Sequence, residues 1–215
     1  MKPLVVLVVL LGVLGLSVTM TSAAVVERTG NLDANWNLIA LPSVPLEPEP
    51  TTIFGAIPID GRLFRWNAPT QSLIAYEAVW PETFGNMLLT DGYWINMDSG
   101  EPFSYDGLDD TDSMDVLISL PKAGWTMIGN PFSYNFPWVN NKVTDGNQTI
   151  TIRDASQYGA NWLYSVGYWW DSSTQSLVEV GLPEDYSNSQ EMLPWHGYWV
   201  LSNIDKIGLI LESIP

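Results

Sequence analysis

The feature that most constrains the fold is a set of three short motifs that the chain repeats in the same order. The first motif reads W-N-L-I-A-L-P in one copy and W-T-M-I-G-N-P in the other. The second is an aromatic segment ending in Trp, followed four residues later by T-Q-S-L, and the third is G-Y-W. Ordered recurrence of this kind predicts a duplicated structural unit. The two copies begin at Trp36 and Trp125, at Trp66 and Trp170, and at Gly92 and Gly197.

Between these motifs the chain consists of short apolar or alternating runs separated by Gly, Pro, Asn and Asp. Many short strands at close spacing are typical of an all-β sandwich or barrel. We therefore predict two tandem homologous β-barrel or β-sandwich units, over 25–107 and 114–215, joined by an acidic linker at 108–113. The first and second motifs lie further apart in the second copy, which predicts an insertion near 143–157 with an extra strand at Ile150–Arg153.

The N-terminus has the pattern of a secretory signal peptide. Lys2 supplies a positive charge, Leu4 to Val18 is an apolar run, and small residues at 21–24 fit a cleavage site. This run is shorter than the ~20 apolar residues of a usual membrane span, and no later segment is apolar enough to be one. We therefore expect residues 1–24 to be removed and the mature chain to be secreted, extracellular or at the cell surface, without a membrane span.

Charge and residue usage exclude several functional classes. The formal net charge is −16, which repels phosphate backbones and argues against nucleic-acid binding. The chain has no cysteine and a single histidine, His196, which argues against cysteine nucleophiles, multi-histidine metal sites and histidine triads. No cofactor is expected from this composition. A carboxylate pair of the kind that glycoside hydrolases use stays open, because Asp and Glu are scattered over the loops.

The acidic segment Asp106–Asp115, which contains the linker, is the one candidate for a metal site. Carboxylates at this spacing offer the several oxygen ligands that Ca²⁺ takes, although the order of an EF-hand loop is missing. The alternative is a solvated linker, which is the commoner role of an acidic run. The candidate ligands are Asp109, Asp110, Asp112 and Asp115.

Repetition separates the aromatic residues into two groups. A large apolar residue present in both copies on one strand face is what a core demands, so we predict Trp36, Trp66, Trp125 and Trp170 to be buried. Trp169 aligns with Arg65 on the opposite strand face, and we expect it to be exposed. Aromatic residues without a counterpart are the candidates for ligand binding. They are Trp169, Trp138, Trp162, Trp80, Trp195, Tyr134 and Tyr158.

Such rings, with amide and carboxyl side chains nearby, could stack on sugar rings, or they could cover loop cores or a protein–protein contact. The repeated G-Y-W and T-Q-S-L motifs are interpreted as architectural, and His196 as a loop residue with local hydrogen bonds. Three functions follow in order of preference: a non-catalytic protein that binds a glycan or another surface ligand, a structural or adhesive subunit that self-assembles or binds a surface protein, and a secreted hydrolase.

The order W-N-L-I-A-L-P, aromatic strand with T-Q-S-L, then G-Y-W-I resembles repeat modules of exported bacterial and archaeal surface proteins. Those modules often read G-W-N-L-I-S-L-P followed by Y-x-W-D and G-Y-W-V. The resemblance covers nearly all of the chain after residue 24 but depends on three short motifs. It implies an extracellular location. Such modules are commonly accessory or cell-surface domains without an assigned activity, so no ligand is implied.

Overall fold

The computed structural model describes residues 24–108, 112–157, 159–185 and 187–214, and it confirms a mostly β fold with several antiparallel sheets. The α-helices among these residues are at most five residues long. None of them has the length and apolar character needed to cross a membrane. The predicted signal peptide lies outside the described residues, except for Ala24.

The N-terminal half, residues 24–108, contains two sheets. β1 pairs with β6, and the four-stranded sheet has the order β2-β5-β3-β4. Its elements are β1 (Val25–Leu32), β2 (Asn35–Ile39), α1 (Pro50–Phe54), β3 (Leu63–Asn67), β4 (Ser72–Ala75), α2 (Pro81–Phe84), β5 (Tyr93–Met97) and β6 (Glu101–Leu108).

The C-terminal half, residues 112–214, contains a four-stranded sheet of order β13-β12-β15-β8, a second of order β11-β10-β16-β7, and the short pair β14-β9. Its elements are β7 (Val116–Leu120), β8 (Gly124–Gly129), β9 (Phe136–Pro137), η2 (Trp138–Asn140), β10 (Lys142–Thr144), β11 (Thr149–Thr151), α3 (Ile152–Ser156), β12 (Gly167–Asp171), β13 (Ser176–Val180), η3 (Pro183–Asp185), β14 (Glu191–Met192), β15 (Gly197–Ser202) and β16 (Ile207–Leu211).

The predicted extra strand is shorter than expected. β11 ends at Thr151, and the chain then turns into α3. The hydroxyl of Thr151 accepts a hydrogen bond from the backbone N–H of Asp154 at 3.1 Å, which caps the helix and ends the strand. The strand expected over Ile150–Arg153 is therefore wrong in its second half, where local capping overrides the β-branched pattern.

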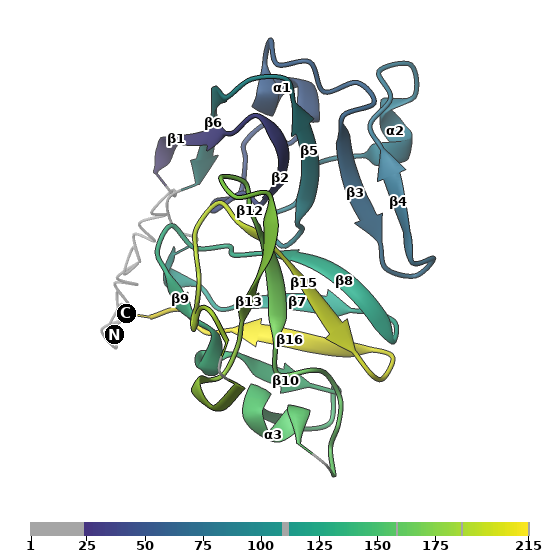
Figure 1. Ribbon diagram of the computed structural model, residues 1–215, viewed down its shortest axis with the longest axis vertical. Coiled ribbons are helices and arrows are strands. Elements are labelled where there is room, and N and C mark those ends of the chain that lie inside the picture. Colours follow the sequence, from purple (N-terminus) through teal and green to yellow (C-terminus); the bar gives the residue numbers. More distant parts are fainter. Residues whose placement is uncertain (1–23, 109–111, 158, 186, 215) are drawn as a thin grey trace, which may run out of the picture.

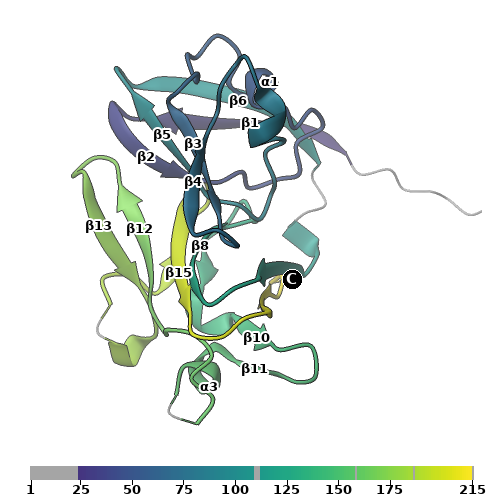
Figure 2. The ribbon, with the colours of Figure 1, turned by 90° about the vertical axis from the view of Figure 1, so that its right-hand side faces the viewer.

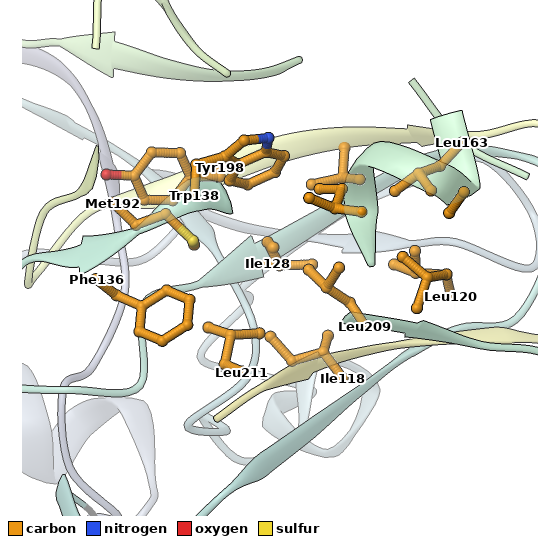
Figure 3. Close-up of a cluster of buried hydrophobic side chains, with 14 of the residues drawn as sticks. Ile118, Leu120, Ile128, Phe136, Trp138, Leu163, Met192, Tyr198, Leu209 and Leu211 are labelled. Atoms are coloured by element: carbon orange, nitrogen blue, oxygen red, sulfur yellow. The ribbon is translucent and has the colours of Figure 1, made fainter. Parts of the chain in front are cut away.

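Each half has its own hydrophobic core. In the N-terminal half, Tyr93, Ile95 and Phe103 belong to one buried cluster. In the C-terminal half, the buried cluster draws residues from β7, β8, β15 and β16 and includes the fully buried Trp138. Figure 3 shows Tyr198 beside Trp138, with Ile128 and Leu209 in the same cluster. Alternation along β7 places Val116, Ile118 and Leu120 inside this core, with exposed residues between them.

The halves lie against each other through the β2-β5-β3-β4 sheet of the N-terminal half and the β13-β12-β15-β8 sheet of the C-terminal half. Figures 1 and 2 show the β12–β13 hairpin beside β2 and the β3–β4 hairpin reaching β8. Both hairpins belong to repeated motifs, and each crosses to the other half. The contact between the halves is therefore built by residues that the sequence repeats.

Candidate binding site: two aromatic pockets

The repeated G-Y-W motif supplies one core residue and one surface residue in each half. Tyr93 and Tyr198 are fully buried, and the phenol of each accepts a hydrogen bond at 2.6 Å from the backbone N–H of a leucine five residues earlier. Burial raises the pKa of both tyrosines above the usual range, so each phenol stays neutral. Since neighbouring strand residues face opposite ways, Trp94 and Trp199 lie on the other face of their sheets, half-buried.

The first pocket opens on this face of the N-terminal sheet. Its volume is about 340 Å³, and every lining side chain is apolar or aromatic. Trp36 is 39% exposed and Leu73 51% exposed, so the pocket is open to solvent. Its lining residues are Trp36, Phe64, Leu73 and Trp94 from the N-terminal half and Trp170 from the C-terminal half.

The second pocket, of about 320 Å³, lies on the corresponding face of the C-terminal sheet. Leu177 is 57% exposed at its edge. Each residue that lines the first pocket has its motif counterpart here. The lining residues are Trp125, Tyr168, Leu177 and Trp199, with Trp66 from the N-terminal half, and Trp94 and Trp170 where the two pockets adjoin.

Tryptophans of the two halves contact one another edge to face. The ring centroids of Trp66 and Trp199 are 4.9 Å apart, and those of Trp94 and Trp170 are 5.4 Å apart. Trp66 corresponds to Trp170 in the repeat, and Trp94 corresponds to Trp199. The two contacts therefore join the same two motif positions, with the halves exchanged. Edge-to-face geometry is a favoured aromatic arrangement, and a ring from the other half forms part of the wall of each pocket.

Hydrogen bonds fix the crossing rings. The indole N–H of Trp66 donates to the backbone carbonyl of Trp125 at 2.7 Å, and that of Trp170 donates to the backbone carbonyl of Trp36 at 3.0 Å. The other four pocket tryptophans make no indole hydrogen bond within the described residues. They are Trp36, Trp94, Trp125 and Trp199. The side chain of Trp36 is 39% exposed, and the indole nitrogens of the other three are not among the buried atoms without a partner. The N–H groups of all four are therefore available as donors to a ligand.

The glutamine of each T-Q-S-L motif also crosses between the halves. Gln71 accepts from the backbone N–H of Trp125 at 2.8 Å and donates to its carbonyl at 2.9 Å. Gln175 makes the same two bonds to Trp36, at 3.1 and 2.9 Å. Both tryptophans lie on edge strands, so each glutamine satisfies backbone groups that no neighbouring strand reaches. Both glutamines adopt a positive φ of 51°.

Short bridges extend both sheets across the same contact. Ile39 at the end of β2 bridges to His196, and Ile128 near the end of β8 bridges to Asp91. The halves approach so closely here that a Cβ added to Gly197 would lie 2.9 Å from the carbonyl oxygen of Ile39, and one added to Gly92 would lie 2.9 Å from that of Ile128. The glycine of G-Y-W is thus required by backbone approach between the halves.

Behind each pocket, on the opposite sheet face, the two halves differ. Arg65 forms a 2.8 Å ion pair with Asp91, and burial raises the pKa of that carboxyl despite the arginine. In the C-terminal half the aligned residues are Trp169 and His196, whose rings meet edge to face at 4.8 Å. Burial lowers the pKa of His196, while its hydrogen bond to the Pro194 carbonyl opposes that shift. An ion pair in one half is therefore replaced by an aromatic pair in the other.

The predicted core tryptophans are placed differently from expectation. Trp36 is 39% exposed, and Trp66, Trp125 and Trp170 are half-buried around the pockets, outside both core clusters. The prediction of burial in the two cores is therefore wrong. A residue that is repeated in both copies can lie at the contact between the copies, and these four tryptophans lie around the pockets there.

Trp169 and Trp170 are also reversed. Trp169 packs against the C-terminal core, and its indole nitrogen is buried, whereas Trp170 lines both pockets. The opposite directions of the two side chains were predicted correctly, but the assignment of core and surface face was wrong.

The remaining candidate ligand-binding residues that the structure describes do not line the aromatic pockets. Trp138 is fully buried and Trp162 is 8% exposed, both in the C-terminal core, and Tyr134 packs against the same core. Trp195 packs against the core of the N-terminal half, 5.5 Å from the Phe103 ring. Trp80 is 58% exposed beside α2, away from the pockets. Tyr158 lies outside the described residues.

The calcium prediction receives no support from the acidic residues that are described. Asp109 and Asp110 lie outside them, and no group of three or more potential ligands gathers elsewhere in the described ranges. Asp112 accepts hydrogen bonds from the backbone and hydroxyl of Ser133, and Asp115 accepts one from the backbone of Ser213 at 2.9 Å. These two carboxylates attach the start of the C-terminal half to its loops.

Sequence reasoning did not assign a binding role to the pocket residues, although one signal was present. Tyr93 and Trp94 are adjacent large aromatics in one strand, as are Tyr198 and Trp199. Apolar residues on both faces of a strand indicate that both faces are covered. Here the second face is covered partly by the other half and partly left open.

Comparison of the chain with protein-family models, curated proteins and solved structures gives no match.

Proposed function

We propose that the protein is a non-catalytic binding protein that holds a glycan in its two aromatic pockets. The observation that carries the proposal is the pair of open, aromatic-lined pockets built from the same motif residues in the two halves. Exposed apolar surface of this kind is costly in water and marks interaction sites. Because no Asp, Glu, His, Lys or Arg side chain is among the lining residues of either pocket, binding fits them better than catalysis.

A sugar ring suits these pockets on two grounds. The apolar C–H faces of a pyranose can stack on the ring faces of Trp36 or Trp125, burying apolar area. Its hydroxyls can accept from the indole N–H groups that have no partner in the described residues, such as those of Trp94 and Trp199. Two pockets that adjoin at Trp94 and Trp170 suit two residues of one chain-like ligand.

We also propose that the halves arose by duplication and that the protein is exported. The matching strand orders, β2-β5-β3-β4 and β8-β15-β12-β13, support the first part, together with the exchanged glutamine and tryptophan contacts. The signal-peptide pattern in the sequence supports the second. N-terminal sequencing of secreted protein tests export, with a start at Ala24 or Val25 expected and an intact Met1 contradicting it.

The binding proposal is tested with a glycan array, followed by calorimetric titration of the best ligand. Trp36→Ala and Trp199→Ala should each weaken binding about tenfold or more, since one stacked ring contributes roughly 1–3 kcal/mol in comparable sites. Trp80→Ala is the matched control, because Trp80 is exposed but lies outside the pockets. Unchanged affinity in both pocket variants, or no binding to any glycan, would overturn the proposal.

The alternative is a structural or adhesive subunit that associates through the same face. The exposed Leu73 and Leu177 favour it, since apolar residues at an open edge also suit a protein contact. Light scattering at increasing protein concentration distinguishes the two. Self-association that Leu73→Asn and Leu177→Asn abolish would favour the subunit role, and a monomer that binds glycan would exclude it.

A further inference from the structure

The two pockets differ in two polar groups. Tyr168 in the second pocket corresponds to Phe64 in the first, so only the second pocket has a phenol hydroxyl. Directly across the strand pair from Tyr168 stands Glu179, and the residue across from Phe64 is Ala75. Directly opposed cross-strand side chains lie about 4.5–5.5 Å apart at Cβ, so Glu179 lies beside Tyr168, which lines the second pocket.

The side chain of Glu179 lies on the pocket face. It follows Leu177 by two residues in β13, and residues two apart in a strand share a face. The residue is half-buried, and its carboxylate makes no hydrogen bond or ion pair within the described residues. Burial raises the pKa of Tyr168, and the negative charge of Glu179 adds to this shift.

The charge of the protein favours a positively charged ligand at this place. Lys and Arg number 8 against 24 Asp and Glu. Several of these basic residues are already paired with carboxylates elsewhere, as Arg65 is with Asp91 and Arg153 with Glu184. An unpaired carboxylate beside several aromatic rings is a surrounding that attracts cations through charge and through the ring faces.

We propose that the second pocket binds an alkylammonium group, enclosed by the rings of Trp125, Tyr168 and Trp199 and neutralised by Glu179. This inference rests on the proposed function, because it assigns a positively charged substituent to the ligand of the same site. The first pocket has the same aromatic frame without the carboxylate. It therefore takes the uncharged part of the ligand.

The test compares choline with 3,3-dimethylbutan-1-ol, its uncharged carbon isostere, by calorimetric titration against the exported chain. Choline should bind about tenfold more tightly, since a desolvated cation–π contact supplies that much discrimination. Glu179→Gln should weaken choline binding about fivefold or more and leave binding of the isostere unchanged. Ala75→Glu should create choline binding at the first pocket and raise the stoichiometry from one to two. Trp80→Ala is the control that leaves binding of choline unchanged, because Trp80 is exposed and lines neither pocket.

Equal affinity for choline and its isostere would show simple apolar burial and overturn the inference. Wild-type choline affinity in Glu179→Gln, with folding verified by thermal melting, would also overturn it. Titration of the array-selected neutral glycan separates the two proposals. Glycan binding without choline binding rejects only the alkylammonium site. Choline binding without glycan binding rejects the glycan proposal and leaves the cation site standing.

Discussion

The side chain of Gln71 is expected to stabilise the contact between the halves, and its removal is the most informative perturbation of the fold. It accepts from the Trp125 backbone N–H, donates to the Trp125 carbonyl, and donates to the Ala68 carbonyl at 2.7 Å. Gln71→Ala removes all three bonds. The Trp125 carbonyl keeps the indole N–H of Trp66, so the N–H of Trp125 and the carbonyl of Ala68 are the groups that lose their partner.

The size of the loss follows from these contacts. A net hydrogen bond contributes about 0.5–1.5 kcal/mol, so three bonds at a half-buried site suggest about 2–3 kcal/mol for Gln71→Ala. The bonds from Gln175 to Trp36 are exposed, and water replaces them more readily, so Gln175→Ala should cost only about 1–2 kcal/mol.

Two further variants separate hydrogen bonding from backbone strain. Gln71 has a φ of 51°, which costs a non-glycine residue about 1–2 kcal/mol. Gln71→Gly relieves that strain but still loses the bonds, so it should be more stable than Gln71→Ala and less stable than the natural chain. Gln148→Ala is the control at an exposed glutamine, with an expected change within about 0.5 kcal/mol.

Urea unfolding followed by tryptophan fluorescence measures these differences as shifts in the midpoint at constant m-value. The reasoning is refuted if Gln71→Ala unfolds at the same urea concentration as Gln148→Ala. It is also refuted if Gln71→Gly is more stable than the natural chain, because strain relief would then outweigh the bonds between the halves.

Three other outcomes follow from the structure. Trp138→Ala should lower the free energy of unfolding by about 3–5 kcal/mol in thermal or urea melts, because it leaves a cavity at a fully buried position. Trp36→Ala should lower it by less than half as much, because Trp36 is 39% exposed. Gly197→Ala should destabilise by about 1–3 kcal/mol, since the new methyl group meets the Ile39 carbonyl oxygen, and a variant as stable as the natural chain would contradict that close approach. Burial lowers the pKa of His196, so the unfolded chain binds the imidazole proton more readily than the folded chain does. The contribution of His196 to stability should therefore be fully present above pH ~6.5 and should be lost as the pH falls through the lowered pKa. His196→Gln should remove that part of the pH dependence in melts between pH 4 and 8.

The strands themselves were largely predictable from local pattern. The runs around Val116–Leu120 and Tyr93–Met97 alternate as strands do, and the structure has strands there. Periodicity also placed Trp169 and Trp170 on opposite faces. Capping was harder to foresee: Thr151 ends a strand whose apolar pattern continues, because one hydrogen bond to Asp154 decides the local conformation.

Which face of a strand becomes core could not be predicted, because both faces of the repeated strands are apolar and one sequence offers no further test. In this protein the face with Tyr93 is buried within its own half, and the face with Trp94 meets the other half and the solvent. The local pattern of the sequence is sufficient for a mostly β fold and for the order of the repeated strand motifs. That Trp36 and Trp125 line pockets depends on how one half packs across the other. This packing joins residues more than a hundred positions apart, such as Gln175 and Trp36, and no local pattern encodes it.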